Sequence, residues 1–257
     1  MSFTALSPDW QMTVLFFLLL LPLCFLMKVT AFWGTPESKD WRLMLAPFPT
    51  PLSVKQALPL SAAPRLISRF LVALVPCVFS YWLCRKLWSD LRAPPILLCY
   101  AGAIILWLVT EALGSLAPLL ALPAGKFLPL PHGASPPLAR SLSDFWGRRW
   151  NVWMSGWFRQ MIFRPLSHRP ALALFAVFFA SGVMHEGVIN VPLYVVTGKN
   201  CFGTMMLYFL LQAVGILLER RTRRRGVRRL LVWLFVFGAA PLMVNEGLLR
   251  ILHLWPE

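Results

Sequence analysis

Long apolar runs, separated by short basic or proline-rich stretches, make up most of this chain. Each run approaches or exceeds the roughly 20 residues that an α-helix needs to cross a bilayer. We therefore predict an all-α polytopic membrane protein, a single integral domain over residues 1–257, with roughly six to eight transmembrane helices and additional amphipathic or re-entrant segments. The predicted spans cover residues 12–33, 66–84, 94–123, 171–194, 202–218 and 230–252.

Two stretches do not fit a simple span. Residues 34–64 contain six prolines, which predicts an interfacial segment or a short irregular span. Residues 94–123 are long for one crossing, and Gly114 and Pro118 are candidate breaks. If the basic residues on both sides of that run lie in the cytoplasm, the run must cross twice or re-enter.

The composition supports a membrane protein, with 58% hydrophobic and 14% charged residues and a mean hydropathy of +0.65. The net charge of +15 comes from 25 basic and 10 acidic residues. These basic residues lie between the apolar runs, as expected of cytoplasmic loops, and no soluble segment presents them to nucleic acid. The arginine-rich residues 220–229 are interpreted as a determinant of topology and lipid-headgroup contact rather than as a site.

The cysteines argue against a disulfide- or zinc-stabilised protein, and the N-terminal apolar run argues against a cleaved signal peptide. The five cysteines form no Cys-x-x-Cys pair and most lie in apolar runs, so we predict neither a disulfide framework nor a zinc site. No basic residue precedes the apolar run that begins at Met12, and no small-residue cleavage site follows it cleanly. We therefore expect that run to be a retained span rather than a signal peptide.

A histidine and a glutamate inside a predicted span are the strongest candidate for chemistry. His185 lies fourteen residues into the run 171–194, about 21 Å along a helix and inside the hydrocarbon layer. Such residues either join helices through hydrogen bonds or mark a functional site. Ser181 and Gly182, one turn earlier, leave space beside an imidazole that can act as a general base. Glu186 points about 100° away on the helix, so its partner is expected on another helix.

A tryptophan- and arginine-rich stretch precedes that span. Ser141 is a predicted N-cap, with Asp144 three residues later, as in a capping box. Four tryptophans then recur with helical spacing, which predicts one amphipathic helix with its aromatic face toward the membrane interface. The tryptophans are at positions 146, 150, 153 and 157, and the arginines at 148, 149 and 159 lie off that face.

Three polar residues of this stretch have two possible roles each. Asn151 is either an ordinary interfacial residue or a neutral group that holds a reacting carbonyl or hydroxyl. Arg148 and Arg149 either bind phosphate groups, such as those of coenzyme A, or anchor the chain on the cytoplasmic side.

Two further acids, Glu111 and Glu246, also fall inside predicted spans. Each is expected to be hydrogen-bonded within the bundle rather than catalytic. An alternative reading is a small transporter in which these acids form a proton or ion relay with His185 and Glu186. That reading predicts inverted halves with matched broken helices, and no such repeat is present in the sequence.

Taken in order, these motifs resemble a known family. Ser-Leu-Ser-Asp-Phe-Trp-Gly-Arg-Arg-Trp-Asn at 141–151, followed by Ala-Ser-Gly-Val-Met-His-Glu at 180–186, is similar to the wax synthase branch of the membrane-bound O-acyltransferase superfamily. The resemblance is clear over about residues 129–221. The chain is shorter than typical plant members, and the double-histidine motif of soluble-type wax ester synthases is absent.

The resemblance implies transfer of an acyl group from acyl-CoA to the hydroxyl of a lipophilic alcohol. A long-chain fatty alcohol would give a wax ester, whereas a terpenoid, sterol or diacylglycerol acceptor, or a catalytically inactive structural subunit, remains an alternative. His185 and Asn151 would be catalytic, supported by Glu186, Ser181 and Asp144. Acyl-CoA would be bound by Arg148, Arg149, Trp146 and Trp150.

The same resemblance defines the expected partners and location. Acyl-CoA is a co-substrate and no permanently bound cofactor or metal is expected; membrane lipids are the other partners. The arginine- and alanine-rich composition suggests a GC-rich genome, and hence the bacterial inner membrane, whereas a eukaryotic member would lie in the endoplasmic reticulum.

Overall fold

The computed structural model describes residues 3–34, 59–91, 94–124, 130–133 and 135–255. Every regular element within these residues is helical, which confirms the predicted all-α membrane class. Most of residues 34–64, where an interfacial segment was predicted, lie outside the described residues. The long helices of the bundle are α1 (Pro8–Gly34), α2 (Ala63–Leu91), α3 (Pro95–Ala121), α6 (Pro170–His185) and α8 (Thr204–Arg220).

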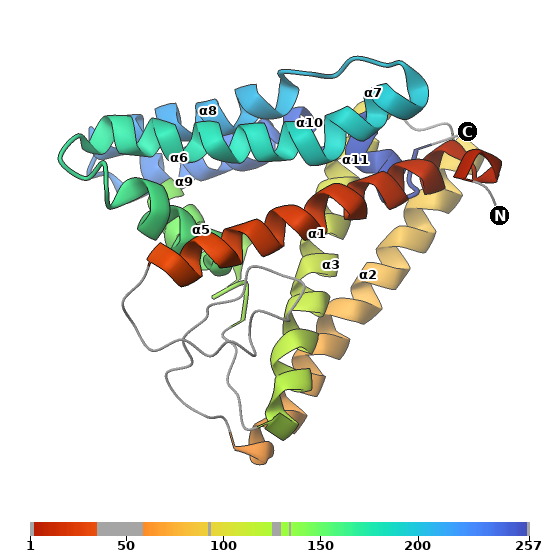
Figure 1. The fold of residues 1–257 in the computed structure, drawn as a ribbon, viewed down its shortest axis with the longest axis horizontal. Helices are drawn as coiled ribbons and strands as arrows, with labels where there is room; N and C mark the ends of the chain where they lie inside the picture. The colour runs from red at the N-terminus through yellow and green to blue at the C-terminus, as the bar shows by residue number, and fades with distance from the viewer. Residues whose placement is uncertain (1–2, 35–58, 92–93, 125–129, 134, 256–257) are drawn as a thin grey trace.

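Helices α6 and α8 lie side by side, α1 crosses below them, and the paired α2 and α3 extend away from that layer (Figure 1). The close contact between α6 and α8 depends on Gly182, because a Cβ there would lie 2.8 Å from Met206 Sδ. The space that Gly182 was predicted to leave beside the imidazole is therefore occupied by α8. Large apolar side chains such as Leu18, Val72 and Leu120 are 62–70% exposed, as expected of surfaces that face lipid.

Five helical stretches of the described residues are long and apolar enough to cross a membrane, which is fewer than the six to eight predicted. They are Pro8–Gly34, Leu60–Lys86, Pro95–Ala121, Pro170–Thr197 and Arg225–Met243. The stretch from Pro170 includes the π-helical segment Glu186–Asn190 and α7 (Val191–Thr197). Helix α8 is apolar but has only 17 residues.

The run 94–123 does not break at Gly114 or Pro118, since α3 continues through both. Gly114 is needed for packing rather than for a bend, because a Cβ there would overlap the ring of Pro131. The two-crossing alternative for this run is therefore wrong: one helix of 27 residues, about 40 Å long, accounts for it.

The last predicted span, 230–252, begins earlier and ends earlier than expected. It starts with α9 (Arg225–Val232), continues through a π-helical segment (Trp233–Gly238) and ends with α10 (Ala240–Met243). Asn245 then caps the separate helix α11 (Glu246–Ile251), and its Nδ2 donates to Asn190 Oδ1 at 2.9 Å and Thr204 Oγ1 at 3.0 Å. These bonds give a buried amide enough partners to interrupt the helix.

The predicted tryptophan helix is also interrupted. Ser141 does cap it, because its Oγ accepts from the Asp144 N–H at 3.0 Å. The helix then ends after α4 (Leu142–Asp144) and a π-helical segment (Phe145–Arg149), and α5 (Val152–Phe158) starts afresh after Asn151. Asn151 has φ 38° and ψ 63°, the left-handed conformation, and no continuous helix passes through it.

Candidate active site

A cavity of about 580 Å³ lies between α1, α3, α6 and the segment around residues 143–163. Asn151 and His185, which are 34 residues apart in the chain, both line it. Apolar side chains of α1 form one wall, among them Phe16, Leu20 and Met27. The volume falls within the roughly 300–1,000 Å³ typical of small-molecule sites.

The His185 ring has one defined tautomer. Its Nδ1 lies 2.7 Å from the carbonyl oxygen of Ser181, one turn earlier in α6, while Phe209 packs against the ring with centroids 4.5 Å apart. A carbonyl oxygen can only accept, so Nδ1 carries the proton and Nε2 of the neutral imidazole holds a lone pair. This is the form that a general base requires.

Glu186 does not contact the cavity. Its Oε1 accepts from the backbone N–H groups of Gly203 at 2.9 Å and Met206 at 3.0 Å, and its Oε2 accepts from Asn190 Nδ2 at 2.6 Å. The predicted partner on another helix is present, since Met206 belongs to α8, and Asn190 is an additional partner four residues along its own helical stretch. Glu186 holds the N-terminal end of α8 against α6, where a carboxylate is also favoured by the helix dipole.

Asn151 is held by backbone and side-chain bonds at the break before α5. Its Oδ1 accepts from the Met154 N–H at 3.3 Å, and its own N–H donates to His132 Nδ1 at 3.2 Å. The adjacent loop closes the break further, because Gly133 N–H donates to Arg149 O and Val152 N–H donates to Pro131 O. The left-handed backbone of Asn151 is thus fixed from two sides.

His132 is a site residue that the sequence analysis missed. It lines the same cavity and is 2% exposed. Because Nδ1 accepts from Asn151, Nε2 carries the proton and donates to Thr110 Oγ1 at 3.0 Å. Burial, with the charge of Arg69 nearby, lowers the pKa of His132 to about 4. The only sequence signal was a histidine in a proline-rich linker, which indicates a turn rather than a buried ring.

The tryptophans face the protein interior rather than the membrane interface, so that prediction was wrong. Trp146, Trp150 and Trp153 line the cavity, and Trp157 donates from Nε1 to Met27 O in α1 at 2.8 Å. Trp146 Nε1 donates to Gln212 Oε1 at 3.2 Å. These bonds satisfy indole N–H groups that would be costly to bury unpaired.

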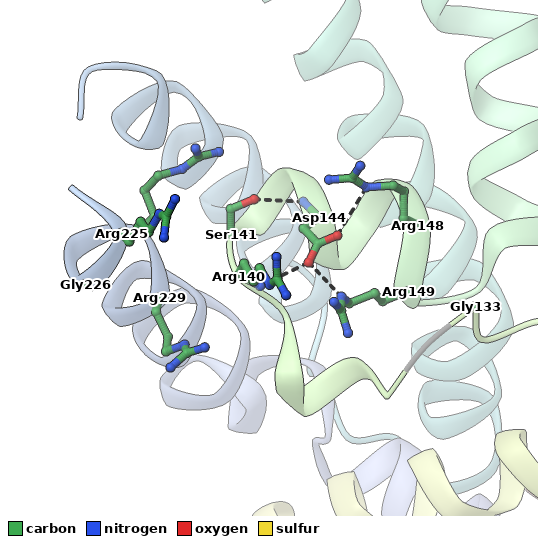
Figure 2. Close-up of a pocket in the computed structure, with 10 residues that line it drawn as sticks. Gly133, Arg140, Ser141, Asp144, Arg148, Arg149, Arg225, Gly226 and Arg229 are labelled. Atoms are coloured by element: carbon green, nitrogen blue, oxygen red, sulfur yellow. Dashed lines mark hydrogen bonds and ion pairs between the residues drawn. The ribbon is translucent and has the colours of Figure 1, made fainter. Parts of the chain in front are cut away.

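A second, basic cavity of about 930 Å³ lies on the other side of the same short segment; we call it the arginine basin. Figure 2 shows Asp144 between Arg148 and Arg149 on one wall and Arg225 and Arg229 on the facing helix. The basin is lined by Gly133, Arg140, Ser141, Asp144, Arg148, Arg149, Arg225, Gly226, Arg228 and Arg229.

Asp144 organises one wall of this basin. Its carboxylate pairs with Arg149 Nε at 2.7 Å and Arg148 Nε at 3.2 Å, and accepts from the Arg140 N–H at 3.0 Å. Burial raises the pKa of Asp144, but these hydrogen bonds and charges outweigh burial and hold the pKa below its usual range. Asp144 therefore acts on the arginines and not on the cavity that contains His185.

The predicted site residues are divided between the two cavities. Trp146, Trp150, Asn151 and Ser181 line the cavity with His185, whereas Arg148 and Arg149 line the arginine basin. The cavity has its own arginines, at positions 159 and 220.

The two other acids that were predicted inside spans are paired elsewhere, and Glu246 lies in α11, beyond the last span. Glu111 binds Arg69 with an Oε1–Nη2 distance of 2.5 Å, which joins α2 to α3. Glu246 binds Lys199 at 2.7 Å and Arg250 at 2.8 Å. Neither lines the cavity, and within the described residues no group of His, Cys, Asp or Glu side chains is arranged to hold a metal ion.

Most of the residues that line the cavity lie in a part of the chain that matches a known family. Residues 131–211 match the Membrane bound O-acyl transferase family. The resemblance to membrane-bound O-acyltransferases of the wax synthase branch is confirmed. The matched residues include His132, Asn151 and His185 but end before the arginines of α9.

Individual relatives agree with the family match. The chain is 35% identical over 124 residues to the probable long-chain-alcohol O-fatty-acyltransferase 7 of Arabidopsis thaliana, and 32% identical over 143 residues to number 8 of that series. These alignments cover 42% and 51% of this chain but only 35% and 41% of the relatives. A third relative, acyl-CoA–sterol O-acyltransferase 1 of the same plant, is 40% identical over 65 residues, 22% of this chain and 19% of its own length. The chain thus spans less than half the length of these relatives.

Proposed function

We propose that this protein transfers an acyl group from acyl-CoA to the hydroxyl of a lipophilic alcohol, most simply a long-chain fatty alcohol, to give a wax ester. The observation that supports this most is that Asn151 and an imidazole with its Nε2 lone pair available line one largely apolar cavity. The similarity to plant long-chain-alcohol acyltransferases supports the same reaction.

In the proposed mechanism, His185 Nε2 removes the proton from the acceptor hydroxyl as its oxygen attacks the thioester carbon. The Asn151 amide donates a hydrogen bond to the carbonyl oxygen as negative charge develops there. The carbon–sulfur bond then breaks, and the CoA thiolate takes the proton from the His185 imidazolium. The products are the ester and free CoA, and no acyl-enzyme is needed.

The surroundings of His185 suit this chemistry. The Ser181 carbonyl keeps the Nδ1 proton in place and stabilises the imidazolium that forms during the reaction. Glu186 supports the site indirectly, because it fixes the start of α8, the helix that carries Phe209 beside the imidazole. The aromatic side chains of Trp146 and Trp150 exclude water from the reacting groups.

The apolar wall formed by α1 favours an acceptor with a long hydrocarbon chain. Each buried CH₂ contributes about 0.8 kcal/mol, so KM for the alcohol should fall about fourfold per added CH₂ until the chain outgrows the cavity. A sterol acceptor is the second candidate, supported by the similarity to a plant sterol acyltransferase. We assign acyl-CoA binding to the basic side, where Arg148 and Arg149 lie, and the alcohol to the lipid side.

The membrane location follows from the spans, but the compartment is part of the proposal. The composition suggested a bacterial inner membrane, whereas the plant relatives favour the endoplasmic reticulum. In either membrane the arginine-rich loop before α9 is expected on the cytoplasmic side, where acyl-CoA is available.

The decisive experiment measures ester formation from labelled palmitoyl-CoA and hexadecanol with the purified full chain. His185→Ala should lower the rate by about 10²- to 10⁴-fold, the range that general-base catalysis contributes. His168→Ala is the matched control, because His168 is exposed and does not line the cavity. Full activity of His185→Ala in a folded protein would refute the mechanism, and activity with cholesterol but no fatty alcohol would reassign the acceptor.

The transporter alternative receives no support from the geometry. Of its four proposed relay groups, His185 alone lines the cavity, because Glu186, Glu111 and Glu246 are each bound to partners elsewhere. A relay requires neighbouring groups that exchange protons, and these four are not arranged in that way.

A further inference from the structure

The arginine basin contains more positive charge than its own carboxylate can neutralise. Six of its ten lining residues are arginines, and Asp144 is the one acid among them. The arginines come from two parts of the chain: three lie at positions 140–149 and three belong to α9. A concentration of like charge is destabilising unless an anion balances it, which points to a ligand.

Not all of these arginines are available to a ligand. Arg148 and Arg149 are both paired with Asp144, and Arg228 is paired with Glu219 at 2.9 Å. Among the ion pairs of the described residues, none involves Arg140, Arg225 or Arg229. The unneutralised charge of the basin is therefore shared by its two walls, and within the described residues the basin arginines without an ion-pair partner are Arg140, Arg225 and Arg229.

Topology alone does not explain this arrangement. The arginine-rich loop also contains Arg223 and Arg224, which are exposed, as Arg225 and Arg229 are, but do not line the basin. A topogenic or headgroup role depends on the number of charges near the membrane and would treat all of these arginines alike. The structure instead separates Arg225 and Arg229, which face Asp144 across the basin, from their neighbours in the loop (Figure 2).

We infer that Arg225 and Arg229, together with Arg140, bind the phosphate groups of coenzyme A, and that Arg148 and Arg149 form the opposite wall through their bonds to Asp144. This inference rests on the acyl-CoA reaction proposed above. The 3′-phosphate and pyrophosphate of CoA together carry roughly four negative charges near pH 7. Guanidinium groups bind such oxygens in pairs, and a volume of about 930 Å³ is large enough for a nucleotide.

The position of the basin fits a ligand that also reaches the cavity. The basin and the cavity flank the same segment: Ser141 and Asp144 line the first, while Ser143 and Gly147 line the second. A nucleotide in the basin therefore lies beside the space in which the thioester is proposed to react.

The test measures CoA binding to the purified full chain in neutral detergent, by equilibrium dialysis, for two double variants with the same loss of charge. Arg225→Gln with Arg229→Gln should weaken binding of CoA about 100-fold, roughly tenfold for each arginine. Arg223→Gln with Arg224→Gln should leave Kd within about twofold. Adenosine 3′,5′-bisphosphate, used as a competitor, should lose affinity in the same variant. Arg140→Gln provides a single substitution outside α9, with an expected loss of about tenfold.

Each other outcome overturns the inference. Equal weakening in both double variants would mean that the loop acts by overall charge. Unchanged CoA binding in the first double variant, with weaker binding of phosphatidylserine from mixed micelles, would assign these arginines to anionic lipid. CoA binding is measured without turnover, and it is measured in His185→Ala as well. The experiment therefore distinguishes failure of the proposed reaction from failure of CoA binding in the basin.

Discussion

His132 offers the sharpest test of how the fold supports the proposed chemistry, because its two ring nitrogens have separate partners. Nδ1 accepts from the Asn151 N–H at 3.2 Å, and Nε2 donates to Thr110 Oγ1 at 3.0 Å. Asparagine places an acceptor near the position of Nδ1, whereas glutamine places a donor near that of Nε2. His132→Asn therefore preserves the bond to Asn151, and His132→Gln preserves the bond to Thr110.

The expected effect of losing the bond between His132 and Asn151 follows from the backbone conformation of Asn151. A buried N–H that loses its acceptor costs about 1–3 kcal/mol, and a non-glycine residue in the left-handed region needs such support to stay there. If Asn151 leaves its position, the turnover rate should fall by about 5- to 150-fold, since 1.4 kcal/mol corresponds to a factor of ten. His132→Gln should show this loss in kcat with little change in KM for acyl-CoA, while His132→Asn should stay within a few-fold of wild type.

The same residue predicts a dependence of stability on pH. Because burial lowers the pKa of His132 from 6.5 to about 4, the unfolded chain binds more protons than the folded protein between these values. The free energy of unfolding should therefore decrease as the pH falls from 6.5 to 4, by up to about 3 kcal/mol from this group. His132→Asn should lack that part of the decrease, measured as unfolding in detergent at pH 7 and pH 4.5.

The assay is ester formation at several acyl-CoA concentrations, together with the unfolding midpoint of each variant. Thr110→Val serves as the control, because it removes the Nε2 partner and leaves the bond to Asn151 intact. If His132→Gln is as active as His132→Asn, or if activity merely follows stability across all three variants, His132 does not act by positioning Asn151.

Three further predictions concern Asn151 and two residues, Glu219 and Gly182, that hold the surrounding helices together. Asn151→Gly should keep the stability of the wild type, since glycine accepts the left-handed backbone, but lose about 10²- to 10³-fold in kcat; equal activity would exclude the amide from the reaction. Glu219→Gln should lower the unfolding free energy by about 2 kcal/mol, because the buried carboxylate joins the N–H groups at the start of α4 to α9, and unchanged thermal unfolding would contradict that role. Gly182→Ala should destabilise the protein through overlap with Met206 by about 1–3 kcal/mol, whereas Gly187→Ala, with open space around its Cβ, should not; a similar unfolding midpoint for the two variants would argue against the packing.

The sequence was most informative where one physical requirement dominates. Apolar runs must form helices in a membrane, because every backbone N–H and C=O needs an internal partner there. The membrane class and the helical fold were therefore predictable, and the imidazole deep in a span that led to the choice of His185 lines the cavity. Glu186 was predictable only in part: the helical angle separated it from His185, but its bonds to the start of α8 depend on how two helices pack.

The sequence was least informative where periodicity competes with local backbone chemistry. Tryptophans at i, i+4, i+7 and i+11 predict one continuous helix with an aromatic face, and nothing in that spacing reveals the π-helical segment or the left-handed Asn151 that interrupt it. The interruption is stabilised by Pro131, His132 and Gly133, whose contacts with residues 149–152 are tertiary. Charge counting has a similar limit, because it cannot distinguish Arg225 from Arg224.

The wrong prediction of a continuous tryptophan helix and the failure to predict His132 have one physical cause, the break of the helix at Asn151. The same break explains how Asn151 is held at the cavity. In a continuous helix through Asn151, the N–H of that residue would donate to a backbone carbonyl one turn earlier. His132 Nδ1 would then receive no hydrogen bond from it. The break releases the N–H for His132, places the Asn151 side chain at the N-cap of α5, and leaves Arg149 O for Gly133. The segment before the break has two different sides, since Trp146 lines the apolar cavity while Arg149 lines the basin. The break that the tryptophan spacing does not predict is therefore what holds Asn151 and His132 together at the cavity, next to the short segment that the cavity and the basin share.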